Sequence, residues 1–161
     1  MGRLRDGEWI AGAGGIALLA AMFLHWYALD LGPVPDAVSD FVDIGAEATA
    51  WQAFGVLDIV LALLALVPLG LVITQATRSS PSIPIAFTVL TTLAGALAAL
   101  LILYRIVNQP GPNDVVEVQA GAWLGLLAAL VIAGGGWRSM RVEPIPGAPT
   151  PPVEDLPLPA P

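Results

Sequence analysis

Three ionisable side chains interrupt apolar stretches of this sequence: His25, Asp58 and Arg105. Asp58 lies among leucines, valines and isoleucines, where an ionisable residue is expensive and therefore suggests a function or a partner. A carboxylate in that setting can release a proton, coordinate a cation or pair with a base. Arg105 is the natural base, and Tyr104 beside it adds a hydroxyl group. Each of these chemistries requires the helices to point the side chains at one another.

Composition places the chain in the membrane class, because 57% of its residues are hydrophobic and only 12% are charged. It has no Cys, which excludes disulfides, thiol redox chemistry and Cys-based metal sites. Its basic residues are six Arg and no Lys, too few and too scattered for a nucleic-acid surface. We therefore expect no nucleic-acid partner, no cofactor and no metal; the expected partner is the lipid bilayer.

Four apolar runs are long enough to cross a bilayer, which takes about 20 helical residues. They predict an all-α membrane protein, a four-transmembrane-helix bundle. The expected spans are residues 9–27, 51–73, 84–107 and 119–137. The segments outside them are residues 1–8, 28–50, 74–83, 108–118 and 138–161. The first run is interpreted as an uncleaved span rather than a signal peptide, because bulky residues follow it where a cleavage site needs small ones.

Arginine positions predict the orientation. Five of the six Arg fall on one side of a four-span chain, so both termini are expected in the cytoplasm of a cell-membrane protein. The first outer loop, 28–50, is acidic, and the spacing of Val38, Phe41 and Val42 predicts a short surface helix. Its acids lack the spacing of a calcium loop, which favours a solvated loop over cation binding. The Pro-rich segment 138–161 is expected to be a disordered tail, and whether it binds a partner is left open.

Small residues indicate which helix faces meet, since helices in lipid associate by close packing. Gly121, Gly125 and Ala129 recur every four residues and predict a packing stripe. His25, Asp58 and Arg105 share stripes with small residues in their own spans, which predicts an outer-leaflet polar cluster of these three with Tyr104. Asp58 and Arg105 are expected to form an ion pair there. The expected outer aromatic belt consists of Trp26, Tyr27, Trp51 and Trp123.

The segments "FLHWY", "AWQAFGVLD", "LYRIVNQPG" and "GAWLGLLAALVIAGGGWRSMR" resemble a group of small four-span membrane proteins of actinobacteria and their relatives. The resemblance covers the four spans and the second outer loop. The residues that match the shared pattern are Trp26, Tyr27, Trp51, Phe54, Asp58, Tyr104, Arg105 and Trp123. The sequence departs from the pattern at His25, where the resemblance implies Pro. The resemblance implies the four-span fold and transfers no activity.

Three functions are compared. The favoured one is a non-catalytic membrane bundle, an accessory or envelope-associated protein stabilised by the Asp58–Arg105 pair. The alternative is an oligomeric transporter or channel-like subunit that uses Asp58, although four spans without an internal repeat make a poor solitary transporter. An enzyme is disfavoured, because one His and no Cys leave little for a nucleophile–base pair or a zinc site. The sequence leaves open whether a second copy or another membrane protein binds the bundle.

Overall fold

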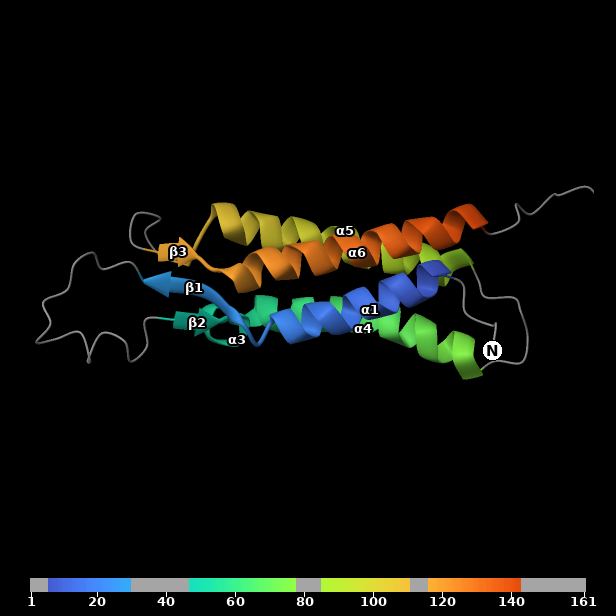
Figure 1. Ribbon diagram of the computed structural model, residues 1–161, viewed down its shortest axis with the longest axis horizontal. Helices are drawn as coiled ribbons and strands as arrows, with labels where there is room; N and C mark the ends of the chain where they lie inside the picture. Colours follow the sequence, from blue (N-terminus) through green and yellow to red (C-terminus); the bar gives the residue numbers. More distant parts are fainter. Residues whose placement is uncertain (1–5, 30–46, 78–84, 111–115, 143–161) are drawn as a thin grey trace, which may run out of the picture.

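The computed structural model describes residues 6–29, 47–77, 85–110 and 116–142. Within them, four long helices lie side by side, and three short strands gather at one end (Figure 1). The long helices are α1 (Asp6–Ala21), α4 (Val56–Thr77), α5 (Ile85–Val107) and α6 (Ala120–Val142). The remaining elements are the single-turn helix α3 (Ala50–Ala53) and the strands β1 (His25–Leu29), β2 (Glu47–Thr49) and β3 (Val116–Val118). We call the end with the strands the strand end, and the opposite end, where α1 begins and α6 finishes, the far end.

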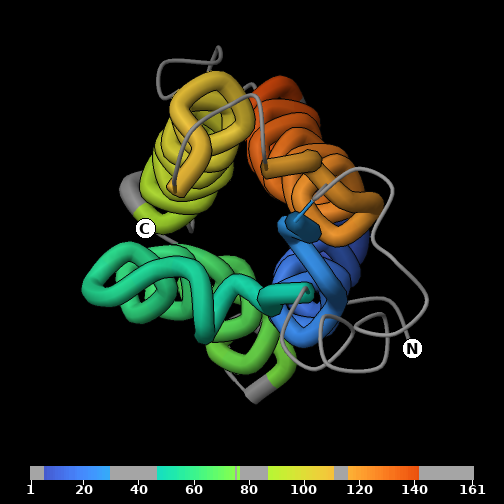
Figure 2. The backbone as a smooth tube through the Cα atoms, turned by 90° about the vertical axis from the view of Figure 1, so that its left-hand side faces the viewer, coloured from blue at the N-terminus to red at the C-terminus, as the bar shows by residue number. Residues whose placement is uncertain are grey.

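The four long helices form a ring when viewed from the strand end (Figure 2). α1 lies between α4 and α6, and α5 lies between α6 and α4. Glycines permit the closest approaches: a Cβ added at Gly14 would lie 3.1 Å from the Ala128 carbonyl oxygen, and one at Gly95 would lie 2.4 Å from the Ala133 nitrogen. Backbones this close are typical of helices that associate without a hydrophobic driving force. The ring encloses an apolar core. Its fully buried side chains include Leu18, Leu61, Leu71, Ile102 and Ile132.

Three of the helices are long and apolar enough to cross a membrane. Their qualifying stretches are Val56–Thr74, Phe87–Val107 and Ala120–Arg141. The chain is therefore a membrane-embedded, mostly helical protein, as its composition predicts. α1 is shorter: its 16 residues rise about 24 Å, against a hydrocarbon thickness of about 30 Å.

The first predicted span, 9–27, does not continue as a helix to its end. α1 ends at Ala21, a turn follows, and β1 begins at His25. Strand pairing takes over at this point, because Tyr27 pairs with Ala48 on one side and with Val118 on the other. The apolar pattern of the sequence is unchanged by this switch from helix to strand, so hydropathy gives no sign of it.

The sheet has the strand order β2-β1-β3, and both pairings are antiparallel. Its register is irregular between His25 and Tyr27, where one extra residue bulges from β1. Each outer strand has three residues, so neither offers a long edge for pairing with another chain. The sequence does not predict the sheet, because β2 and β3 fall in the expected loops 28–50 and 108–118.

Other boundaries differ as well. Trp51 belongs to the separate turn α3, and the second long helix begins only at Val56. α6 extends to Val142, so the first residues of the predicted tail, from Arg138, are helical. The predicted surface helix at residues 38–42 and the Pro-rich residues 143–161 lie outside the described residues.

Candidate functional site

Trp26 is the centre of the strand end. Its side chain is fully buried, and its indole Nε1–H donates a hydrogen bond of 2.7 Å to the carbonyl oxygen of Ala21. Ala21 is the last residue of α1, where carbonyl groups have no partner within the helix. The ring also packs edge-on against Phe54, with the centroids 5.5 Å apart. The Ala21 carbonyl oxygen also accepts a hydrogen bond of 3.1 Å from the Leu24 N–H, so Trp26 gives the end of α1 a second hydrogen bond and fills the space beneath the sheet. It is a core residue and does not belong to an aromatic belt.

Gly121 and Gly125 of α6 make room for this indole. A Cβ at Gly121 would lie 2.7 Å from the ring atom Cδ1 of Trp26, and one at Gly125 would lie 2.8 Å from Cζ2. Ala129, one turn further along α6, is also fully buried. The three small residues thus lie on the inner face of α6, and two of them face an aromatic ring rather than another helix.

Tyr27 attaches the sheet to α5. Its hydroxyl donates a hydrogen bond of 2.9 Å to the backbone carbonyl oxygen of Arg105, and its ring lies edge-on to Phe54 at 5.8 Å. The side chain is 3% exposed, so Tyr27, like Trp26, is not part of an outer belt. Burial raises the pKa of the Tyr27 hydroxyl above its ordinary value, while the nearby positive charge of Arg105 acts in the opposite direction.

Arg105 makes a cation–π contact and not the predicted ion pair. Its guanidinium carbon lies 4.6 Å from the centroid of the Phe54 ring. Its Nε atom is buried and has no hydrogen-bond partner. No ion pair joins Arg105 to Asp58, although both residues are in the described part of the chain. The guanidinium group thus lies over the ring of Phe54, a residue of the segment that connects α3 to α4.

Asp58 has a local structural role. It is the third residue of α4, is 7% exposed, and its Oδ1 accepts a hydrogen bond of 2.7 Å from the backbone N–H of Ile59. The N–H groups of the first helical turn lack partners within the helix, and the helix dipole favours a carboxylate at that position. The sequence placed Asp58 seven residues inside a span beginning at Trp51. Because α4 starts at Val56, the carboxylate is at a helix terminus instead.

His25 and Tyr104 do not join a cluster with Asp58. His25 lies in β1, and its Nδ1 is 3.0 Å from Oε2 of Glu47, with both side chains more than half exposed. This pair connects neighbouring strands at the surface, outside the helices. Tyr104 is 58% exposed, and its hydroxyl accepts a hydrogen bond of 2.7 Å from Nδ2 of Asn108. The predicted four-residue polar cluster is therefore not assembled.

Exposed aromatic side chains are found at both ends of the bundle. At the strand end, Trp51 and Trp123 are exposed, and the Trp51 ring lies 5.9 Å from that of Phe23. At the far end, Trp9 and Trp137 are exposed, and the guanidinium of Arg141 lies 5.3 Å from the Trp137 ring. The second group was not expected from the sequence. Two Trp residues near the ends of apolar runs were the available signal.

The buried Glu8 near the far end was not expected from the sequence either. Glu8 is 2% exposed, although the sequence placed it in a solvated N-terminal segment. Its spacing from the buried residues Ala11, Gly15 and Leu18 matches a helix face, which is the signal that could have found it. Thr91 is also buried, and its hydroxyl donates a hydrogen bond of 3.0 Å to the Phe87 carbonyl oxygen, as mid-helix threonines commonly do.

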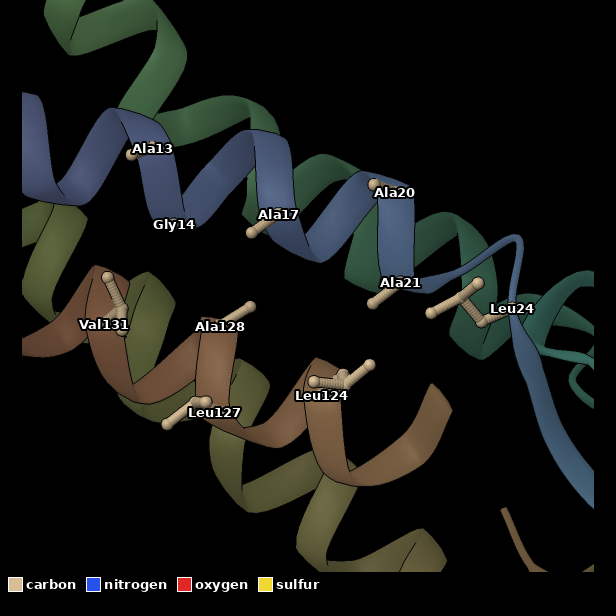
Figure 3. Close-up of a pocket in the computed structure, with 10 residues that line it drawn as sticks. All are labelled: Ala13, Gly14, Ala17, Ala20, Ala21, Leu24, Leu124, Leu127, Ala128 and Val131. Atoms are coloured by element: carbon tan, nitrogen blue, oxygen red, sulfur yellow. The ribbon is translucent and has the colours of Figure 1, made fainter. Parts of the chain in front are cut away.

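A groove of about 480 Å³ opens between α1 and α6 on the side of the bundle (Figure 3). Every residue that lines it is apolar. The α1 wall is made of small residues and ends at Leu24. The α6 wall carries Leu124, Leu127, Ala128 and Val131. The alanines of α1 lie along one side of the groove, and Leu124, Ala128 and Val131 of α6 point toward them from the other side.

Comparisons with models of known protein families, with curated proteins and with solved structures found no match to this chain. The resemblance to small four-span proteins of actinobacteria therefore stays a prediction from the sequence segments quoted above.

Proposed function

We propose that this chain is a non-catalytic membrane protein, an accessory or envelope-associated scaffold that crosses the cell membrane four times and supports a small extracytoplasmic sheet. α4, α5 and α6 have the length and apolarity of membrane spans. α1 packs between α4 and α6. Its exposed Trp9 and Ile16, and the exposed Phe23 just after it, suit contact with lipid. The turn after Ala21 adds the remaining length that the first crossing needs.

The orientation follows from charge. Arg138 and Arg141 lie at the far end, where α1 begins and α4 ends. In the sequence, Arg3 and Arg5 precede α1, and Arg78 follows α4. Basic residues favour the cytoplasmic side, so the far end is assigned to the cytoplasm and the sheet to the outside. Both chain ends are then cytoplasmic.

One observation carries the scaffold proposal: the buried polar groups at the strand end join the sheet to the helices. Tyr27 of β1 binds the α5 backbone, Trp26 of β1 binds the end of α1, and the N–H of Gln119, just before α6, donates to the carbonyl oxygen of Trp26 at 2.8 Å. Three helices are thereby fixed to one strand. This arrangement holds the sheet in a defined position on the helices, which is what a scaffold requires.

The transport alternative is weaker than the sequence suggested. Asp58 already bonds to its own helix, and the core below it is apolar. Leu18, Leu61, Ala98 and Ile132 are fully buried in the interior of the bundle. A proton or ion that moved through the bundle would have to pass these apolar side chains, which form no hydrogen bonds with water.

Two experiments test the proposal. Purified protein in liposomes should give no proton or cation flux above that of empty liposomes, and Asp58→Asn should match the wild type. Flux that disappears in Asp58→Asn would establish the transport alternative.

The orientation is tested by labelling, because the natural chain has no Cys. Glu117→Cys should react with a membrane-impermeant maleimide in intact cells, whereas Arg138→Cys should react only after permeabilisation. The reverse pattern would show that the orientation is the opposite one. Labelling of both residues in intact cells would show that α6 does not cross the membrane.

A further inference from the structure

Two continuous stripes border the α1–α6 groove. On α1, one set of exposed residues recurs at alternating intervals of four and three, the spacing that keeps side chains on one edge of a helix. They are Asp6, Ile10, Ala13, Ala17 and Ala20, and the exposed Leu24 just after α1 continues the series. On α6, one set of exposed residues has the same spacing. They are Leu124, Leu127, Val131, Gly134, Arg138 and Arg141. Neither stripe is covered by another described part of the chain.

The two stripes have complementary shapes. In the groove, the α1 stripe is formed by Ala13, Ala17 and Ala20, with Leu24 at its end, so most of it has only small side chains. The α6 stripe there is formed by the larger Leu124, Leu127 and Val131. Small residues at an exposed position allow another helix to approach closely. The outward faces of α4 and α5 differ, because large side chains such as Leu63, Leu66, Leu93 and Leu100 dominate them. The α1 wall is thus a hollow, and the α6 wall is a ridge at the same depth.

The charges at the far end are complementary too. Asp6 continues the α1 stripe, while Arg138 and Arg141 continue the α6 stripe. Asp6 and Arg138 of one chain are 3.6 Å apart, and their side chains are 84% and 63% exposed. Both groups therefore remain accessible to a second molecule. A surface that pairs an acidic hollow with a basic ridge is complementary to itself.

We infer that the α1–α6 groove is the contact surface of a parallel homodimer. A two-fold axis along the membrane normal places the α6 ridge of each copy in the α1 hollow of the other. The same rotation brings Arg138 and Arg141 of each copy near Asp6 of the other. A two-fold contact of this kind uses the same patch on both subunits and closes without forming fibres. The inference rests on the proposed membrane-spanning orientation, since the axis must run along the membrane normal.

The test compares two leucine substitutions in liposomes. Ala17→Leu fills the hollow with a ridge, and Ala96→Leu makes the same change at an exposed position of α5, away from the groove. Photobleaching steps are counted for singly labelled protein over a series of protein-to-lipid ratios. Wild type and Ala96→Leu should show two steps, and Ala17→Leu should lose the two-step fraction. Because Ala17 is exposed, its substitution should leave the thermal unfolding of the monomer nearly unchanged.

Cross-linking provides a readout that does not depend on Ala17. Two differently tagged copies, one with Ala13→Cys and one with Val131→Cys, are co-expressed and oxidised. Each copy has a single thiol, so a disulfide between them can form only across the dimer. The mixed disulfide should exceed both disulfides between like copies. In the same assay, Asp6→Arg should reduce cross-linking several-fold, and adding Arg138→Asp with Arg141→Asp should restore it.

Two results would overturn the inference. One is a single photobleaching step for wild type at every ratio, which would leave the groove to lipid or to a different protein. The other is a dimer that survives Ala17→Leu and gives no mixed disulfide, which would place the contact on another face. Either result would leave the flux and labelling experiments unchanged, so the scaffold proposal would stand independently.

Discussion

The indole of Trp26 occupies the space that a side chain at Gly125 would need. A Cβ added at Gly125 would lie 2.8 Å from the ring atom Cζ2, and one added at Gly121 would lie 2.7 Å from Cδ1. The indole ring cannot move aside easily, because Trp26 is also held by its hydrogen bond to Ala21 and its contact with Phe54. The buried position of Trp26 in β1 thus requires glycine at residues 121 and 125 of α6.

Gly125→Ala should therefore destabilise the protein by about 1–3 kcal/mol, the usual cost of overpacking a filled core. The matched control is Gly70→Ala in α4, where an added Cβ meets nothing within 4 Å. That substitution should be neutral or should stabilise by up to about 1 kcal/mol, because Ala is the better helix former. Thermal unfolding in detergent measures both. Equal stability of the two variants would show that the indole moves freely.

Tyr27→Phe removes the hydrogen bond to the Arg105 carbonyl oxygen and leaves the ring in place. The expected loss is about 0.5–1.5 kcal/mol, typical of one hydrogen bond. Tyr104→Phe is the control, since that hydroxyl bonds only to the exposed Asn108 side chain, and it should cost less. A larger loss from Tyr104→Phe would contradict the arrangement at the strand end.

The Tyr27 hydroxyl should also make stability depend on pH. Burial raises its folded-state pKa above 10.0, so the folded protein holds this proton more tightly than the unfolded chain. The resulting contribution is fully present below the unfolded pKa of about 10 and is lost as pH rises through the folded value. The chain has two Tyr, so tyrosinate absorbance in a Tyr104→Phe background reports Tyr27 alone. A midpoint below pH 10 would contradict the prediction.

Asp58 and Arg105 should behave as independent groups. Asp58→Asn keeps an oxygen that can accept the Ile59 N–H and loses the favourable charge at the helix start, at a cost of about 0.3–1 kcal/mol. Arg105→Gln loses the cation–π contact, worth about 0.5–2 kcal/mol. A double-mutant cycle in detergent should then show little coupling. Either single mutant losing about 3–5 kcal/mol with recovery in the double mutant would restore the ion pair.

Phe54 is the partner that should couple to Arg105. In Phe54→Leu the ring that receives the guanidinium is absent, so Arg105→Gln should cost less there than in the wild type. The difference between these two costs, from the same unfolding measurements, isolates the cation–π term. Identical costs in both backgrounds would show that the guanidinium is held by other groups.

The surface pair of His25 and Glu47 should contribute little. Their side chains are 58% and 56% exposed, and solvent-exposed contacts of that kind are worth about 1 kcal/mol or less. His25→Ala, Glu47→Ala and the double variant should all unfold within about 1 kcal/mol of the wild type. A larger loss in either single variant would mean that the strand pairing depends on this contact.

The sequence alone determined that the protein is embedded in a membrane and mostly helical, because long apolar runs have no other stable solution in lipid. It also identified Gly121, Gly125 and Ala129 as one helix face, since the helical repeat fixes which residues share a side. Both inferences depend on local chemistry, which one chain carries in full.

Only the tertiary structure decided what the side chains near the strand end do. Strand pairing ended the first helix at Ala21 and moved His25 to the surface, and the later start of α4 turned Asp58 into a residue of its first turn. These outcomes depend on contacts between residues far apart in the chain, such as Tyr27 with Arg105. Hydropathy treats a buried strand and a buried helix alike, so it could not distinguish the two. That is why the inner face of α6 and the membrane class were predictable, while the partners of the polar groups were not.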